Sequence, residues 1–193
     1  NSIQNAMDVA SVGDALYVQT GTYAEDISDS KKLEFDFGDV TVNSFALISG
    51  AAGSALNGNL TATGNLTSDV AVSLSGDFTA ASIALNDAVK LTGDTTLNTT
   101  AAGNITLASV DGTAGTEALT LDASGGVVSL GDVGDTTALG AVTDINTTTL
   151  AGSNYAAASF DFGDTTLTGN TTLDTSTAGG DITVASVTGA GNA

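Results

Sequence analysis

Pairs of aspartates three positions apart are the residues of this sequence whose type and spacing could support chemistry. Three such pairs occur: Asp36 with Asp39, Asp132 with Asp135, and Asp161 with Asp164. A glycosidase needs two carboxylates at a suitable separation. Carboxylate and carbonyl oxygens are also the ligands that Ca²⁺ takes. The sequence therefore raises two hypotheses, glycoside hydrolysis and calcium binding.

The calcium hypothesis falls on Asp36, Asp39, Asp161 and Asp164, which lie in two copies of the motif FDFGD. Divalent cations would neutralise the field of a chain whose formal net charge is −19. The sequence contains neither an EF-hand loop nor the Gly-rich nonapeptide of calcium-binding toxin repeats. Diffuse screening by cations is the alternative, and the repetition of FDFGD also suits an architectural role.

Residue types that most enzyme mechanisms need are missing. The chain has no His, Cys, Trp or Arg, and three Lys stand against 22 acidic residues. A Ser–His pair and a thiolate nucleophile are therefore excluded, and no P-loop is present. Lys31 and Lys32 are expected in a solvated turn and Lys90 on the surface. We therefore expect no enzymatic activity.

The negative charge also limits the partners of the chain. Binding a polyanion requires a cationic patch, so nucleic acid and anionic membrane surfaces are not expected to bind. No stretch approaches 18 consecutive apolar residues, so membrane insertion is not expected either. The absence of Cys together with His is common in long bacterial surface proteins.

Composition predicts an all-β fold. With 24 Gly and no Pro, the turns must use Gly, Asn and Asp, which tolerate positive φ. Thr and Val favour strands, and an apolar content of 41% favours a folded chain over a disordered one. Triplets such as Leu119–Leu121 and Ile182–Val184 alternate apolar residues with Thr, so the apolar side chains can point inward.

Internal repeats indicate the architecture. The segment from Leu91 to Gly115 recurs from Leu167 to Gly191 at an offset of 76 to 77, and FDFGD recurs from Phe35 to Phe160 at an offset of 125. These offsets share a unit of about 25 residues, which suits one coil of a β-solenoid. The unit predicts about seven to eight coils in a rod on the order of 35 Å long. An antiparallel sandwich is the alternative, but its modules repeat at roughly 90–100 residues.

The first residues differ from the repeats and predict a cap. Ser2 is a candidate N-cap, and residues 1–12 are expected to form a helix that covers the open end of the solenoid. Gly13–Asp14 then turns the chain, and Leu16 and Val18 begin the first strand. The apolar face of this helix follows helical spacing: Ile3, Ala6, Met7 and Ala10.

The stretch SIQNAMDVASVGDALYVQTGTYAEDI, with KKLEF after it, resembles the cap and first coil of right-handed parallel β-helix proteins of the pectin-lyase-like superfamily. Thr20 departs from that pattern, in which Pro often stands before Gly-Thr-Tyr. Later phrases such as LTGNTTLDTSTAGGDITVASV resemble repeats of filamentous-haemagglutinin-like bacterial surface proteins, which are also right-handed β-helices. Enzymes of the superfamily use Arg, Lys or His beside acidic residues, so the lack of Arg and His argues against carrying their activity over.

These observations predict one β-solenoid domain over residues 1–193, with a capping helix at 1–12 and coils at 13–193, in an all-β right-handed parallel β-helix. The chain is interpreted as a piece of a longer one. The expected function is a non-enzymatic, secreted or cell-surface structural subunit of a filament, sheath or layer. The alternatives are the shaft of a bacterial adhesin and a carbohydrate-active β-helix enzyme. Expected partners are other copies, through end-to-end or lateral contacts, and a cell-surface or matrix polysaccharide. Calcium is the candidate cofactor.

Overall fold

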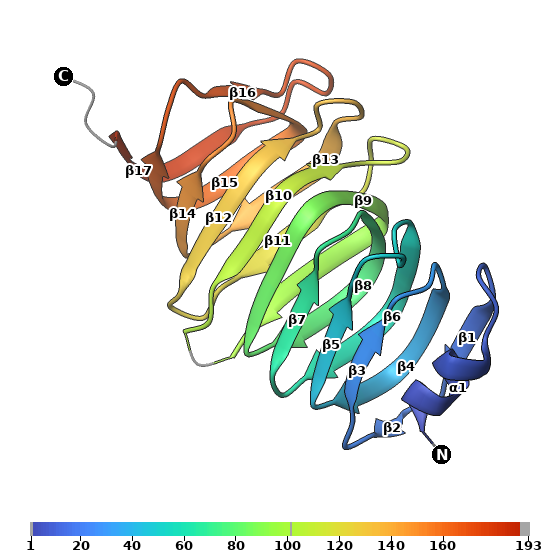
Figure 1. Cartoon of the computed structure of the whole chain (residues 1–193). Coiled ribbons are helices and arrows are strands. Elements are labelled where there is room, and N and C mark those ends of the chain that lie inside the picture. The colour runs from blue at the N-terminus through green and yellow to red at the C-terminus, as the bar shows by residue number, and fades with distance from the viewer. Residues whose placement is uncertain (1, 101, 190–193) are drawn as a thin grey trace.

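The computed structural model describes residues 2–100 and 102–189, which form a parallel β-solenoid of about nine turns (Figure 1). A short helix, α1 (Ile3–Val9), precedes the strands. The strands are β1 (Ala15–Val18), β2 (Gly21–Thr22), β3 (Asp26–Asp29), β4 (Glu34–Val42), β5 (Ser44–Leu47), β6 (Ser54–Ala62), β7 (Asn65–Ser68), β8 (Val72–Ala80), β9 (Ser82–Thr99), β10 (Ile105–Asp111), β11 (Leu119–Asp122), β12 (Val127–Val133), β13 (Leu139–Asp144), β14 (Thr147–Leu150), β15 (Asn154–Leu167), β16 (Thr172–Asp174) and β17 (Ile182–Gly189). The predicted all-β solenoid is confirmed.

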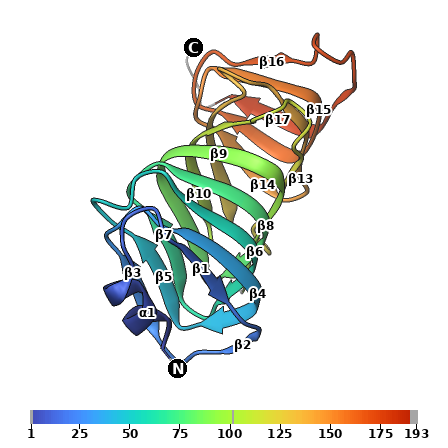
Figure 2. The same ribbon diagram turned by 90° about the vertical axis from the view of Figure 1, so that its right-hand side faces the viewer.

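Each turn passes through three flat faces. In the first turn these are β1, β2 and β3, and the next turn continues them with the two halves of β4 and with β5. We call them the first, second and third face, and each face extends along the rod through the strands that continue its ladder. The pairings are parallel and link each turn to the following one (Figure 2).

The core consists of apolar side chains stacked in columns between the three faces. One column on the first face runs through Leu16, Phe35, Leu56, Leu74 and Leu91. On the N-terminal side of the rod the rings of Phe35 and Phe45 meet edge to face at 5.3 Å between centroids. Because strand side chains alternate, the residues between the inward positions face solvent. Burial of these columns is the main apolar contribution to stability.

The turns are shorter and less regular than the sequence predicts. Val72 pairs with Val89, 17 residues later, whereas Leu97 pairs with Leu121, 24 residues later. The predicted coil of about 25 residues is therefore wrong, and so is the count of seven to eight coils. At about 4.8 Å per turn, nine turns give a rod about 40 Å long.

The sequence repeats do not occupy equivalent places in the solenoid. Ile105 of the first copy lies on the third face, where four successive pairings lead from it to Val187. Its counterpart Ile182 in the second copy pairs with Phe160 on the second face. Four turns span 82 residues along the Ile105 ladder, so an offset of 76 to 77 is not a whole number of turns. Part of the second copy, residues 190 and 191, lies outside the described residues.

The FDFGD motif marks a corner of a turn, and its two copies mark different corners. Gly38 lies between the residues of β4 that pair with β1 and those that pair with β2. Gly163 lies between the parts of β15 that pair with β13 and β14. A Cβ on Gly38 would meet the backbone nitrogen of Thr20 at 2.9 Å, so the corner requires a glycine there. This supports the architectural interpretation of the motif.

Helix α1 lies against the first turn at the N-terminal end of the rod (Figure 2). Ser2 is the N-cap, as predicted, because its Oγ accepts a hydrogen bond from the backbone N–H of Asn5 at 3.2 Å. Ile3 and Met7 are buried, but Ala6 is exposed, so the covered face is narrower than the helical spacing indicates. The helix is also shorter than the predicted range of 1–12.

Two charged side chains of the first turns hold both ends of α1. Glu25 accepts hydrogen bonds from the Ser2 hydroxyl at 2.8 Å and from the backbone N–H groups of Ile3 and Gln4 at 3.2 and 3.1 Å. Lys31 donates to three backbone carbonyl oxygens at the other end, those of Met7, Asp8 and Ala10, at 2.8 to 3.0 Å. A carboxylate at the N-terminus and an ammonium at the C-terminus both complement the helix dipole. Lys31 is therefore a latch for the cap, and the expectation of a solvated turn is wrong for it.

Replacing Gly76 tests the stacked corner between the first and second faces. Gly76 has a φ of +118°, and a Cβ there would collide with the carbonyl oxygen of Gly58 in the preceding turn. Gly76→Ala should lower the free energy of unfolding by more than about 1 kcal/mol, because neither the φ nor the space suits Ala. Urea denaturation followed by circular dichroism measures the change. Gly169→Ala is the control, since no heavy atom lies within 4 Å of its Cβ position, and it should shift stability by less than about 0.5 kcal/mol.

Candidate functional site

The outward ladders interleave acidic residues with neutral ones. On the second face Asp39 pairs with Asn59, which in turn pairs with Asp77, and Asp77 pairs with Thr96. Among the described residues, no ladder pairing brings two carboxylates together. Each acid faces a neutral residue or, in one case, Lys90. Adjacent like charges about 5 Å apart would repel by roughly 1–3 kcal/mol, so this order makes a charge of −19 compatible with stacking.

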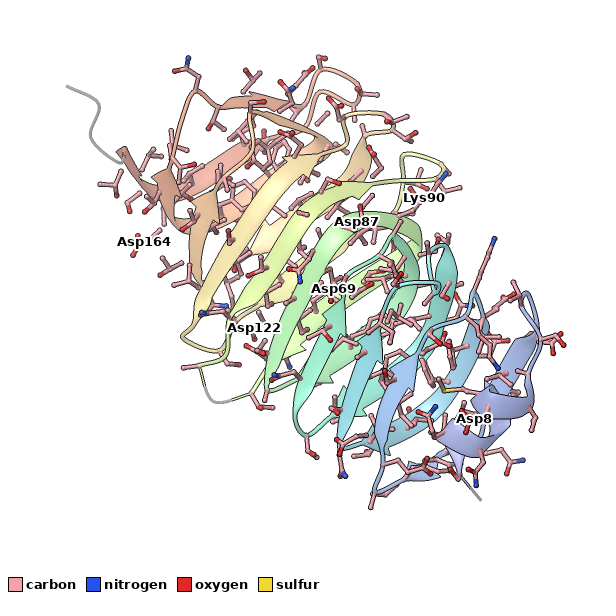
Figure 3. The ribbon with its side chains drawn as sticks, in the orientation of Figure 1. Asp8, Asp69, Asp87, Lys90, Asp122 and Asp164 are labelled. Atoms are coloured by element: carbon pink, nitrogen blue, oxygen red, sulfur yellow. The ribbon has the colours of Figure 1, made fainter. Side chains whose placement is uncertain are left out.

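Hydrogen bonds between turns use the same arrangement. The Asn57 amide donates to Asp36 at 3.2 Å, and the Asn59 amide donates to Asp39 at 2.9 Å. The acidic residues thus serve as acceptors for the amides and hydroxyls of the next turn. Figure 3 shows Asp69, Asp122 and Asp164 spread along the length of the rod rather than gathered in one place.

The structure places each predicted calcium pair across a corner. Asp36 and Asp39 flank the corner at Gly38, and both are exposed. Asp161 and Asp164 flank the corner at Gly163 and are exposed as well. Ser186 donates to Asp164 at 2.7 Å. The two pairs lie near opposite ends of the solenoid, so they form two separate places and not one site.

A calcium ion usually takes six to eight oxygen ligands. The described residues contain no group of three or more His, Cys, Asp or Glu side chains arranged to hold a metal ion. Calcium binding at Asp36, Asp39, Asp161 and Asp164 stays a prediction, with each pair supplying two carboxylates. The absence of enzymatic activity also stays a prediction.

The third aspartate pair has a structural role for one of its members. Asp132 accepts hydrogen bonds from the backbone N–H groups of Asn154 and Ser153, at 2.9 and 2.7 Å. These bonds hold the pKa of the Asp132 carboxyl below its ordinary value, so it is ionised at neutral pH. Asp135 follows at an exposed position of the next turn. Asp132 therefore ties the strand that follows it to its own turn.

Two buried carboxyl groups were not found by the sequence analysis. Asp144 is fully buried in a column where its ladder neighbours are Leu121 and Phe162. Burial raises the pKa of its carboxyl, although the Thr148 hydroxyl at 2.6 Å and the Asn146 backbone N–H at 3.0 Å act in the opposite direction. The strict alternation of Val142, Thr143 and Asp144 places Asp144 inward and is the sequence signal that could have shown this.

Asp29 is the second buried carboxyl group, and it lies on the third face beneath the cap. Burial raises the pKa of Asp29, opposed by the hydrogen bond from the backbone N–H of Lys31 at 3.0 Å. Its Oδ2 atom has no hydrogen-bond partner among the described residues. An unpaired buried oxygen is costly when ionised, which is consistent with the raised pKa.

Comparisons with known proteins leave the family of the chain open. No family model matches it, and neither a curated protein nor a solved structure is significantly similar to it. The β-solenoid class is defined by the structure alone. Along the described chain, no helix has the length and apolar character that crossing a membrane requires.

Asn59→Asp tests the interleaving of charge. The substitution would create three consecutive carboxylates, at positions 39, 59 and 77, and remove the amide bond to Asp39. We expect the free energy of unfolding to fall by about 1–3 kcal/mol at low salt, with much of the loss recovered in 0.5 M NaCl. The control is Thr61→Asp, which adds the same charge between Thr41 and Thr79. Equal losses for both variants in urea denaturation would contradict the role of interleaving.

Asp144→Asn tests the buried carboxyl group. Because its pKa is raised in the folded chain, the folded state holds the proton more tightly than the unfolded state. The related stability is complete below the ordinary Asp value of 3.8 and is lost as pH rises through the folded pKa. The variant should be more stable than the native chain at pH 7, on the order of 1 kcal/mol. The difference should shrink as pH falls to about 4, as measured by urea denaturation across pH.

The matched control for this variant is Asp77→Asn, an exposed position on the same face. It removes the same charge from the solvated side of the sheet. An identical pH profile for the two variants would show that burial of Asp144 is not the cause.

Proposed function

We propose that this chain is a rigid, non-enzymatic rod of an extracellular bacterial or archaeal structural protein, a subunit of a surface filament, sheath or layer. The observation that carries the proposal is the continuity of the ladders. From β1 and β4 to β15 and β17, each turn is paired in register with the next. Force applied along the axis would load the hydrogen bonds of three faces together, which is the property that a stiff spacer needs.

The surface of the rod supports the same function. A strong net negative charge keeps the long sides hydrated and opposes lateral contact between copies at low salt. The apolar side chains exposed at the two ends of the described rod favour end-to-end contact instead. Val9 and Val12 are 86% and 72% exposed beside α1, and Val187 is 60% exposed in the last described turn. A contact between unlike ends can propagate into an open fibre.

The handedness and family belong to this proposal. Parallel crossover connections are right-handed in about 98% of cases, which favours a right-handed solenoid. The resemblance of residues 2–35 to the pectin-lyase-like cap and of the later repeats to haemagglutinin-like surface proteins supports a place on the cell surface.

The shaft of an adhesin is the second candidate, and the latched cap favours it. Glu25 and Lys31 fix α1 over the first turn with six hydrogen bonds. A covered end cannot pair with the end of another copy through its strand edge. A shaft needs only one continuing end, whereas a polymer would require α1 to pack into the neighbour or to move aside.

Electron microscopy combined with light-scattering mass, with and without a calcium chelator, distinguishes the candidates. Ordered fibres or sheets would support the structural polymer. Loss of fibres on chelation would support metal-bridged contacts at the predicted aspartates. Monodisperse rods that are indifferent to chelation would contradict the polymer and favour the adhesin shaft.

The double variant Glu25→Gln/Lys31→Met tests the cap. Without the charged groups the helix loses bonds to charged partners worth about 1.5–3 kcal/mol each, so α1 should detach and uncover the first turn. We expect the mass by light scattering to rise with protein concentration while the strand signal in circular dichroism is kept. Lys32→Met is the control, because it removes a charge from the same turn without touching α1. Association of the control to the same degree would show that charge loss alone is responsible.

A further inference from the structure

A hollow of about 410 Å³ opens on the first face, and two of the three lysines of the chain lie at its ends. Its floor is formed at the outward positions of three successive turns, which hold Gly53, Ala71 and Ala88. The backbones of Val72 and Val89 run between them as parts of paired strands. The hollow therefore results from missing side-chain volume, and its floor is made of methyl groups and ladder backbone.

Lys32 bounds the hollow on the N-terminal side. Its Cε and Nζ atoms lie 3.5 and 3.7 Å from the point where a Cβ of Gly53 would stand. The side chain is exposed and extends over the first turn of the floor. Any larger residue at position 53 would displace it, so the glycine keeps this end of the hollow open.

Lys90 and Asp111 line the C-terminal side, where they are ladder neighbours. The turn at Thr136 and Thr137 closes this side. Its backbone N–H groups donate to Oδ1 of Asp111 at 2.9 and 3.3 Å, and the N–H of Gly112 donates to the Thr137 carbonyl at 3.0 Å. The negative charge of Asp111 is thus partly met by backbone dipoles. Figure 3 shows Lys90 at one edge of the rod, with Asp122 and Asp164 at the other.

Lysine is scarce in this chain, so the position of each one is informative. Lys31 is bound to three carbonyl oxygens of the cap. Within residues 2–100 and 102–189, neither Lys32 nor Lys90 donates a side-chain hydrogen bond to an oxygen of the protein. Two solvated ammonium groups therefore border one hollow on a rod that is otherwise acidic, and they lower the local repulsion of anions.

We propose that this hollow binds a small amphiphilic anion, with its apolar body on the methyl groups of Ala71 and Ala88 and its carboxylate or sulfonate on Lys90. The volume lies in the range of small-molecule sites, about 300–1,000 Å³. A stable contact with a second protein would need roughly 800 Å² per partner, more than a patch of this size provides. The proposal goes beyond the role as a rod, because a stiff spacer does not require a binding site on its side.

Two fluorescent probes test the charge and the floor separately. 8-Anilinonaphthalene-1-sulfonate carries the anion, and N-phenyl-1-naphthylamine is the same molecule without the sulfonate. The intact chain should bind the sulfonate with one-to-one stoichiometry and more tightly than the neutral probe. Lys90→Gln should weaken sulfonate binding about three- to fivefold, the scale of an exposed ion pair, and leave the neutral probe unchanged.

Ala71→Leu should fill the floor and abolish the binding of both probes. Tyr17→Ser is the control, because Tyr17 lines a second hollow of about 370 Å³ beside α1 that could also take an apolar probe. Equal affinity for the two probes, or sulfonate binding that survives both Lys90→Gln and Ala71→Leu, would overturn the proposal. Loss of binding in Tyr17→Ser alone would also overturn it, since the probe would then occupy the hollow at the cap.

Discussion

The parallel, in-register stacking of one turn on the next is the constraint on which the rest of this structure depends. Every residue in a ladder has a neighbour about 4.8 Å above it and another below it at the same position. Inward, this builds columns such as Leu16, Phe35 and Leu56, in which each side chain covers the next. Outward, it would place like charges side by side, and the alternation of Asp39, Asn59 and Asp77 avoids this.

The same constraint explains the exceptions. A turn that carries a small residue at an outward position leaves a gap that its neighbours do not fill, and three such turns create the hollow at Ala71 and Ala88. A turn that carries an acid at an inward position must supply its own donors, as Thr148 and Asn146 do for Asp144. Both features arise because a ladder repeats position but not residue type.

Local signals in the sequence predicted what local structure decides. The alternation of apolar residues gave the strands, and Ser2 with Ile3 and Met7 gave the cap, because both depend on nearest neighbours along the chain. Register could not be predicted, because it depends on how many residues each corner absorbs. The offset from Leu97 to Leu121 includes the long corner at 112–118, where Glu117 accepts backbone hydrogen bonds from Ala114 and from both residues that follow it.

The candidate site was predicted only in part for the same reason. Aspartates three apart were correctly placed on the surface, but whether they share a face depends on the corner between them. The hollow involves Lys32 and Lys90, which are 58 positions apart in the sequence and are brought to one face by three turns of register.

The latch on α1 has a consequence for the order in which the chain assembles. The helix is the first segment to leave the ribosome, yet the groups that hold it, Glu25 and Lys31, are synthesised more than twenty residues later than Ser2 and Met7 respectively. A seven-residue helix is not stable in isolation. The segment that comes first in the chain therefore waits for the first turn to close before it folds, and the end of the rod is sealed only after its beginning has been built.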